Sequence, residues 1–117
     1  MTPVPSGSTG LSELEQQAVA TYFEGDADFY QVFKASAIEQ FPADLQEGDV
    51  AVAAGDAQGL RRAAHTLKGV LLTLGHADMS ALAKGVEQAV QQSPWDEAVA
   101  GWRALRARLV STFSLQP

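Results

Sequence analysis

Residues 60–75 read LRRAAHTLKGVLLTLG, and the apolar residues of this stretch indicate the architecture of the chain. They recur at intervals of four and three, at Leu60, Ala64, Leu67, Leu71 and Leu74. Because successive residues of a helix are about 100° apart, this spacing places them on one side of an α-helix. Asp56 is suited to cap its start, and Gly75 to adopt the left-handed conformation that ends it. We therefore predict a helix over residues 57–74.

Helical periodicity continues on both sides of this stretch. The other expected helices span residues 11–23, 26–54, 77–92 and from Pro94 onward. Ser93 is the expected N-cap of the last helix, and Pro94 its first residue. Pro42 interrupts the long segment, which is therefore one bent helix or two helices end to end. Because short connections imply antiparallel neighbours, the chain is predicted to be all-α, an up-down helical bundle.

The same spacing predicts which apolar residues share one side of each helix. In the first two helices these are Leu11, Leu14, Ala18, Val19, Tyr22, Phe29, Val32, Phe33 and Ala37. In the last two they are Met79, Leu82, Ala83, Val86, Val90, Trp102, Leu105, Leu109 and Phe113. We expect these faces to form the core.

Length, charge and cysteine content exclude several classes of protein. The chain has 117 residues, a net charge of −6 and no cysteine. This length predicts a single domain over residues 11–117, behind a flexible lead-in over residues 1–10. The acidic balance argues against nucleic-acid binding, and the lack of cysteine excludes disulfides, thiolate metal sites and cysteine nucleophiles. Because there is no signal peptide and no long apolar run, we expect a cytoplasmic protein outside the membrane, and Met1 favours a free-standing one.

Charge is divided unequally along the chain. Residues 1–60 contain ten acidic residues and one basic residue, whereas residues 61–117 contain seven basic and four acidic residues. The net charges are therefore −9 and +3, which sum to the −6 of the whole chain. The second half could present a basic surface to an acidic partner, or its charges could simply lie on solvated helix faces.

The predicted helix over residues 57–74 carries unusual residues on its outer face. His65 falls about 140° from the centre of the apolar stripe, Gly69 about 180° and Leu72 about 120°. Lys68 and Arg61 flank the same face. A mid-helix glycine costs about 0.5–1 kcal/mol relative to alanine, and an outward leucine leaves apolar surface in water. Such local inconsistencies are expected at functional sites, although a solvated histidine beside a tolerated glycine is the alternative.

An exposed imidazole with a lysine one turn further on can carry a phosphoryl group. Neutral imidazole is nucleophilic, and the ammonium offsets the negative charge of the group it receives. Metal binding is disfavoured, because His65 and His76 would lie about 16 Å apart along a helix. No serine or cysteine is placed with a base to form a hydrolytic triad.

The stretch from Leu60 to Gly75 resembles the His-x-x-Lys-Gly signature of histidine-containing phosphotransfer (HPt) domains. The preceding Ala-Ala-Gly-Asp and the following Met79, Leu82-Ala83 and Val86-Glu87 are also similar to that family. The resemblance covers about residues 26–113. It implies an antiparallel up-down four-helix bundle with an additional short N-terminal helix. It also implies a covalent phosphoryl carrier without an ATP-binding or kinase domain of its own, and so not an enzyme in the strict sense.

The resemblance assigns roles to individual residues. His65 would accept the phosphoryl group on its outer ring nitrogen from the aspartate of a response-regulator receiver domain, and would return it. Lys68 would steady that group and Gly69 would leave room for the receiver. The resemblance implies no cofactor on this chain, since the magnesium ion is expected on the receiver.

Glu87 is a further candidate. The turn between the helices over residues 57–74 and 77–92 centres near residue 76, so residues whose numbers sum to about 152 lie opposite one another in an antiparallel hairpin. His65 and Glu87 satisfy this sum. Some HPt domains use an acidic residue at this offset to hold the inner imidazole nitrogen, although Glu87 could also be an ordinary flanking residue.

Partners follow from the same resemblance. Receiver domains and a hybrid sensor kinase are implied, and we expect a monomer. The residues expected to contact the partner are Arg61, Arg62, Leu72, His76 and Lys84. Val70, Leu71 and Leu72 replace the small residues usual after the signature, and Gly48 replaces a common leucine, which predicts a looser second helix. The alternatives are a helical adaptor that binds a receiver or kinase without phosphotransfer, and a purely structural bundle.

Overall fold

The computed structural model describes residues 11–116, so the flexible lead-in expected over residues 1–10 lies outside the described residues. Five helices and no strand make up the described part of the chain. They are α1 (Glu13–Tyr22), α2 (Ala27–Ala54), α3 (Ala57–Leu74), α4 (Ala77–Gln92) and α5 (Trp95–Phe113). The prediction of an all-α bundle is confirmed, and the bounds of α3 and α4 agree with it.

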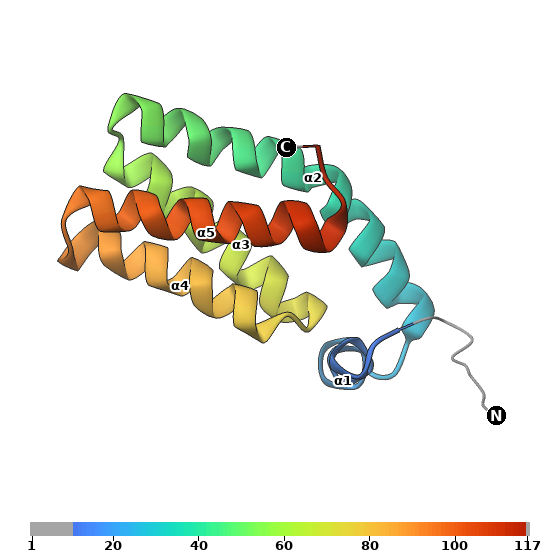
Figure 1. The fold of residues 1–117 in the computed structure, drawn as a ribbon. Coiled ribbons are helices and arrows are strands. Elements are labelled where there is room, and N and C mark those ends of the chain that lie inside the picture. The colour runs from blue at the N-terminus through green and yellow to red at the C-terminus, as the bar shows by residue number, and fades with distance from the viewer. Residues whose placement is uncertain (1–10, 117) are drawn as a thin grey trace.

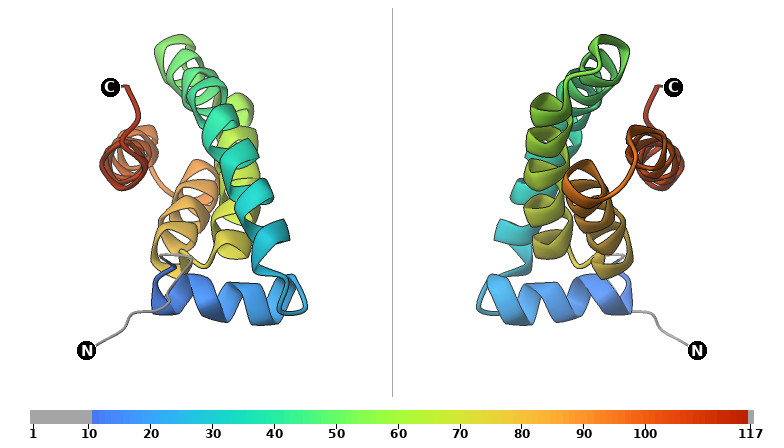
Figure 2. Two further views of the ribbon diagram at one scale, coloured as in Figure 1. Left: turned by 90° about the vertical axis from the view of Figure 1, so that its right-hand side faces the viewer. Right: turned by 90° about the vertical axis from the view of Figure 1, so that its left-hand side faces the viewer.

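Helices α2 to α5 form the bundle, and α1 crosses one end of it (Figures 1 and 2). The core between them is made of large apolar side chains that are almost fully buried, among them Phe41, Leu60, Leu67, Leu71, Met79, Trp102, Leu105 and Leu109. No helix of residues 11–116 is long and apolar enough to span a membrane.

Helix α2 is continuous through Pro42 and bends along its length (Figure 1). Of the two alternatives that the sequence left open, one long bent helix is therefore the one observed. Asp26 caps its start by accepting from the Phe29 N–H, and Gly55 ends it in the left-handed conformation at a φ of 68°. Proline inside a helix removes one backbone donor, which accounts for a bend without a break.

Two predicted apolar faces are wrong in part at the α1 end of the molecule: Ala18, Val19 and Ala37 are buried as predicted, but four larger residues are not. Leu14 and Tyr22 of α1 and Phe29 and Val32 of α2 are exposed, whereas Tyr30 is fully buried. The physical reason is the crossing of α1, which encloses Tyr30 against Glu15 and leaves these four side chains at the surface.

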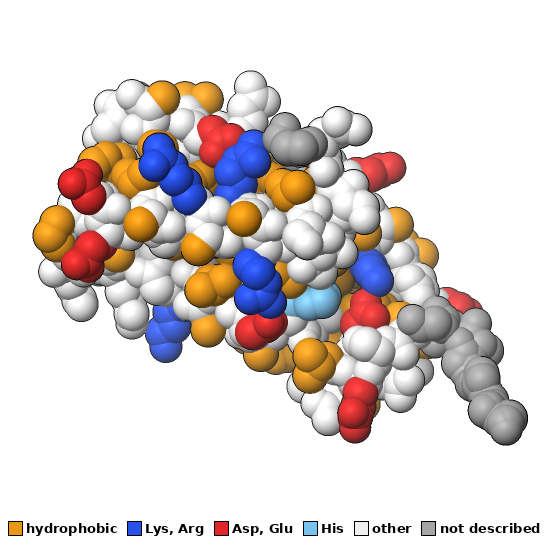
Figure 3. All heavy atoms as spheres, in the orientation of Figure 1, with side chains coloured by type: hydrophobic (Ala, Val, Ile, Leu, Met, Phe, Trp, Pro, Cys, Tyr) orange, Lys and Arg blue, Asp and Glu red, His pale blue; other side chains and the backbone are white. Residues whose placement is uncertain are grey.

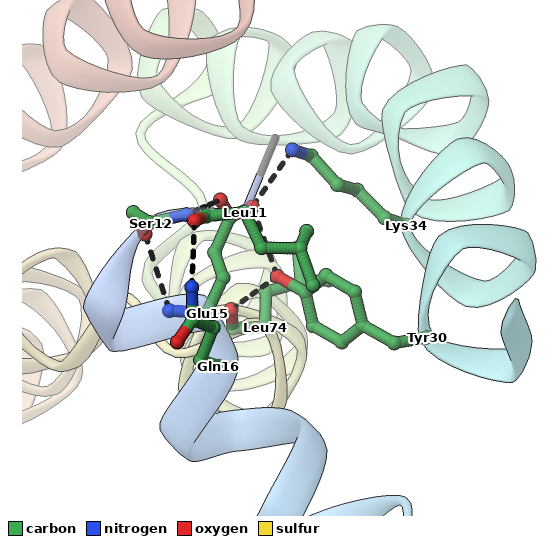
Figure 4. A network of polar contacts seen from close by, with 7 residues as sticks. All are labelled: Leu11, Ser12, Glu15, Gln16, Tyr30, Lys34 and Leu74. Atoms are coloured by element: carbon green, nitrogen blue, oxygen red, sulfur yellow. Dashed lines mark hydrogen bonds and ion pairs between the residues drawn. The ribbon is translucent and has the colours of Figure 1, made fainter. Parts of the chain in front are cut away.

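A polar network holds α1 in place (Figure 4). The Glu15 side chain points inward and is only 7% exposed as a residue. Its Oε2 lies 2.7 Å from the Lys34 ammonium and 3.1 Å from the Tyr30 hydroxyl, which also donates to the Leu74 carbonyl at 2.6 Å. Ser12 and Glu15 complete a capping box at the start of α1. A buried carboxylate thus ties α1 to α2 and α3.

The start of α5 differs from the prediction by one residue. Pro94 is the N-cap and α5 begins at Trp95, whereas Ser93 is the C-cap of α4. The reason is the Ser93 N–H, which still donates to the Ala89 carbonyl of α4 at 2.9 Å.

The looser second helix expected from Gly48 stays a prediction, but the space at this position is filled from α5. Gly48 is buried, and a Cβ at this position would overlap the Trp102 ring. The indole N–H donates to Asp49 Oδ1 at 2.9 Å, and Arg106 of α5 pairs with the same carboxylate. The missing side chain therefore makes room for an indole that joins α5 to α2.

Two of the three basic residues of α5 pair with acidic residues of neighbouring helices. Arg106 pairs with Asp49 of α2 and Arg108 with Asp78 of α4. On the face that α4 and α5 present in Figure 3, basic and acidic side chains are accordingly interspersed.

Candidate functional site

The α3–α4 hairpin places the candidate residues. Gly75 ends α3 with a φ of 98°, and its N–H bonds to the Leu71 and Leu72 carbonyls. Ser80 of α4 donates from its hydroxyl to the Lys68 carbonyl of α3 at 2.9 Å. The tight turn and this cross-link fix the register of the two antiparallel helices, which brings His65 opposite Glu87.

His65 lies on the outer face of α3, with 66% of its side chain exposed. Its Nδ1 lies 2.9 Å from Glu87 Oε2. An ionised carboxylate only accepts hydrogen bonds, so the contact favours the tautomer with the proton on Nδ1. The other ring nitrogen, Nε2, then carries a lone pair. The residues thus present an exposed nucleophile whose ring orientation is held from behind.

Glu87 is shared between two partners of α3. Its Oε1 lies 2.7 Å from the Lys68 ammonium, and only 12% of its side chain is exposed. The interaction with Lys68 lowers the pKa of Glu87; desolvation opposes this shift and the contact with His65 adds to it. Glu87 is therefore ionised near neutral pH, as the tautomer argument requires. Sequence reasoning did not anticipate that Lys68 would be paired with this carboxylate.

Basic side chains gather on both sides of His65. A cleft of about 190 Å³ is lined by Arg61, Lys68, Lys84, Glu87, Gln88 and Gln91. A second cleft, of about 210 Å³, is lined by Gln58, Arg61, Arg62 and His65. The structure therefore places Arg61 and Arg62 in one cleft with the imidazole and Lys84 in the other with Glu87, and these basic residues favour an anionic partner.

Gly69 and Leu72 extend this face toward the α1 end. Gly69 is exposed, and a Cβ added to it would meet no atom of the described residues within 4 Å. Leu72 is 44% exposed. It lines a groove of about 180 Å³ together with Leu14 and Tyr22 of α1. Sequence reasoning missed the two α1 residues because their spacing resembled that of a core face.

His76 is the candidate that the structure separates from the others. It precedes α4 as its N-cap residue, and its ring lies 5.2 Å from that of Phe113 in α5. Burial lowers the pKa of His76, with smaller effects from the surrounding charges. It therefore lies at the hairpin turn, packed against α5, and not beside His65.

Metal-ligating side chains do not cluster in residues 11–116, where no group of three or more His, Cys, Asp or Glu is placed to hold an ion. The arrangement around His65 instead combines a nucleophilic nitrogen, a fixed proton on the other nitrogen and nearby cations. Such a set can accept a group that carries negative charge.

Comparisons with known proteins agree with this chemistry. The family model described as Hpt domain matches residues 28–112, which include α3, α4 and most of α2 and α5 but not α1. No curated protein and no solved structure matches the chain.

Proposed function

The chain belongs to the Hpt domain family, whose members carry phosphoryl groups on histidine in two-component phosphorelays, and we propose that His65 is the phosphoryl acceptor of this chain. It exchanges the group with the aspartate of response-regulator receiver domains, one of them on a hybrid sensor kinase. The observation that carries this proposal is an exposed imidazole whose Nδ1 lies 2.9 Å from the Glu87 carboxylate.

The transfer starts from the neutral ring. Glu87 holds the proton on Nδ1, so the lone pair of Nε2 attacks the phosphorus of the receiver's aspartyl phosphate. The Nε2–P bond forms as the bond from phosphorus to the aspartate oxygen breaks, and the receiver recovers its carboxylate. The ring keeps its Nδ1 proton and becomes positively charged, which the Glu87 carboxylate favours.

Lys68 contributes a movable positive charge. Its side chain is 32% exposed and its ammonium pairs with Glu87 before transfer. A lysine side chain has several rotatable bonds, so the ammonium can turn toward a phosphoryl group on the neighbouring turn of the helix. The divalent cation that the reaction needs belongs to the receiver in this proposal.

The surface around His65 suits a receiver domain. The phosphate-binding pocket of a receiver is built around carboxylates, which complements Arg61, Arg62 and Lys84 at the two clefts. Gly69 offers no side chain to obstruct an approaching backbone, and Leu72 supplies apolar contact area.

The test is labelling from a phosphorylated receiver. Wild type, His65→Gln and the matched control His76→Gln are incubated with phosphorylated receiver domains of the same organism, and the labelled residue is mapped. We expect His65→Gln to lose all acid-labile label with unchanged helical circular dichroism, while His76→Gln keeps it. Label retained in His65→Gln, or mapped elsewhere in wild type, contradicts the proposal.

A further inference from the structure

Glu87 also lies beside the ring once His65 carries the phosphoryl group, and there it has a second role. Resting on the proposed function, we propose that the Glu87 carboxylate keeps the Nδ1 proton on the phosphorylated ring and so keeps the phosphoryl group easy to transfer onward. Glu87 is then a positioning residue that sets how labile the phosphohistidine is, in addition to orienting the free imidazole.

The leaving group decides how readily the phosphoryl group departs. If Nδ1 holds its proton, cleavage of the Nε2–P bond releases neutral imidazole, and the group passes to an aspartate oxygen or to water. If Nδ1 has lost its proton, the same cleavage must expel an imidazolide anion, a much poorer leaving group. The rate of departure therefore follows the fraction of phosphohistidine that is protonated on Nδ1.

The charges around the ring make Glu87 decisive for that proton. The other charged residues that line the two clefts beside His65 are Arg61, Arg62, Lys68 and Lys84, all of them basic. Each of these cations disfavours a positively charged ring. Glu87, which lines the first cleft, is the one acidic residue among those that line the two clefts, and its Oε2 lies 2.9 Å from Nδ1. An opposite charge at this range favours the protonated, positively charged ring.

The hold of Glu87 on the Nδ1 proton is stronger in the phosphorylated protein than in the free protein. It pairs with Glu87 Oε1 at 2.7 Å in the free protein, so the carboxylate divides its charge between the lysine and the imidazole. A phosphoryl group on Nε2 provides a second anion for the ammonium. When Lys68 turns toward it, the Glu87 carboxylate is left to the Nδ1 proton alone.

The decisive experiment removes the charge of Glu87 and keeps its shape. Wild type, Glu87→Gln and the control Glu97→Gln, an exposed acid in the first turn of α5, are phosphorylated with phosphoramidate, a small-molecule donor that needs no receiver. The loss of phosphoryl group from His65 is followed across pH, together with Nδ1 protonation by nitrogen NMR. We expect the midpoint of the acid-promoted loss to fall to lower pH in Glu87→Gln and to stay unchanged in Glu97→Gln.

A second variant is expected to raise the pH midpoint of phosphoryl loss. Lys68→Met removes one of the cations that disfavour a positively charged ring, so its midpoint is expected to move to higher pH. Equal midpoints in wild type and Glu87→Gln, with both folded by circular dichroism, overturn the inference. Should Glu87→Gln not fold, an unchanged or lowered midpoint in Lys68→Met overturns it instead. These outcomes are distinct from failure of the proposed function, which is a wild-type protein that receives no label on His65 from a phosphorylated receiver.

Discussion

Glu15 at the α1 end and Glu87 on the α3–α4 hairpin are built in the same way. Each carboxylate receives a lysine ammonium at 2.7 Å and a ring group at about 3 Å, the Tyr30 hydroxyl at 3.1 Å in one case and His65 Nδ1 at 2.9 Å in the other. Both carboxyls have a lowered pKa. The two networks differ in where the ring lies.

Tyr30 is fully buried, whereas 66% of the His65 side chain is exposed. The Tyr30 hydroxyl has a single proton, which lies between Glu15 and the Leu74 carbonyl and is unavailable to any other molecule. His65 has a second nitrogen that its carboxylate does not touch. The comparison teaches that the same ionic arrangement supports the fold when its ring is enclosed and can support chemistry when one edge of its ring reaches solvent.

The largest difference is expected in stability when each carboxylate is removed. Glu15→Ala leaves the partly buried Lys34 ammonium without its carboxylate and the Tyr30 hydroxyl with the Leu74 carbonyl alone, so we expect the free energy of unfolding to fall by about 2–4 kcal/mol. Glu87→Ala leaves Lys68 and His65 at the surface, where water replaces the carboxylate, and the loss is expected to stay below about 1 kcal/mol. Urea unfolding followed by circular dichroism measures both. If the two variants lose similar amounts of unfolding free energy, the Glu87 network supports the fold as much as the Glu15 network does.

The sequence predicted the α3–α4 hairpin more accurately than the α1 end. The bounds of α3 and α4 depend on local signals, namely leucine spacing, Asp56 as N-cap and Gly75 as the left-handed stop. The opposition of His65 and Glu87 followed from the short turn alone. Both kinds of signal act over a few residues, or along one antiparallel pair, and need no knowledge of the rest of the molecule.

The packing at the α1 end could not be predicted from such local signals. A glutamate such as Glu15 ordinarily lies in solvent, and its burial depends on Tyr30 and Lys34, which reach it only because α1 crosses the bundle. Likewise Gly48 appears as a weakness in the sequence until Trp102 of α5 is seen against it. The pairing of Lys68 with Glu87 was missed because two residues that each suit phosphoryl chemistry were considered separately.

The next test uses alkaline pH, which is expected to weaken the buried network through Tyr30. Burial and then the Glu15 carboxylate raise the pKa of Tyr30 well above its ordinary value of 10.0. Above pH 10 the unfolded chain therefore loses the phenolic proton while the folded chain keeps it, so stability falls as the pH rises. Tyr30→Phe is expected to lose about 1–2 kcal/mol at neutral pH and to abolish most of this alkaline loss.

The matched control for this test is Tyr22→Phe, because Tyr22 is 48% exposed. It is expected to leave both the neutral stability and the alkaline slope as in wild type. Unfolding in urea at pH 8 to 11 gives the comparison. An alkaline slope that persists in Tyr30→Phe would mean that another group of the fold, and not the enclosed phenol, titrates in this range.

The smallest expected effect concerns Gly69, and it separates stability from function most sharply. Both Gly69 of α3 and Gly85 of α4 lie inside helices where an added Cβ meets nothing within 4 Å. Each change to alanine is therefore expected to raise the free energy of unfolding by about 0.5–1 kcal/mol. Gly69→Ala, one turn from His65, is expected to slow transfer from a phosphorylated receiver severalfold, because the methyl group meets the incoming backbone, whereas Gly85→Ala leaves the rate unchanged. Equal rates in the two stabilised variants would show that Gly69 is a tolerated helix residue and that the receiver approaches His65 from another side.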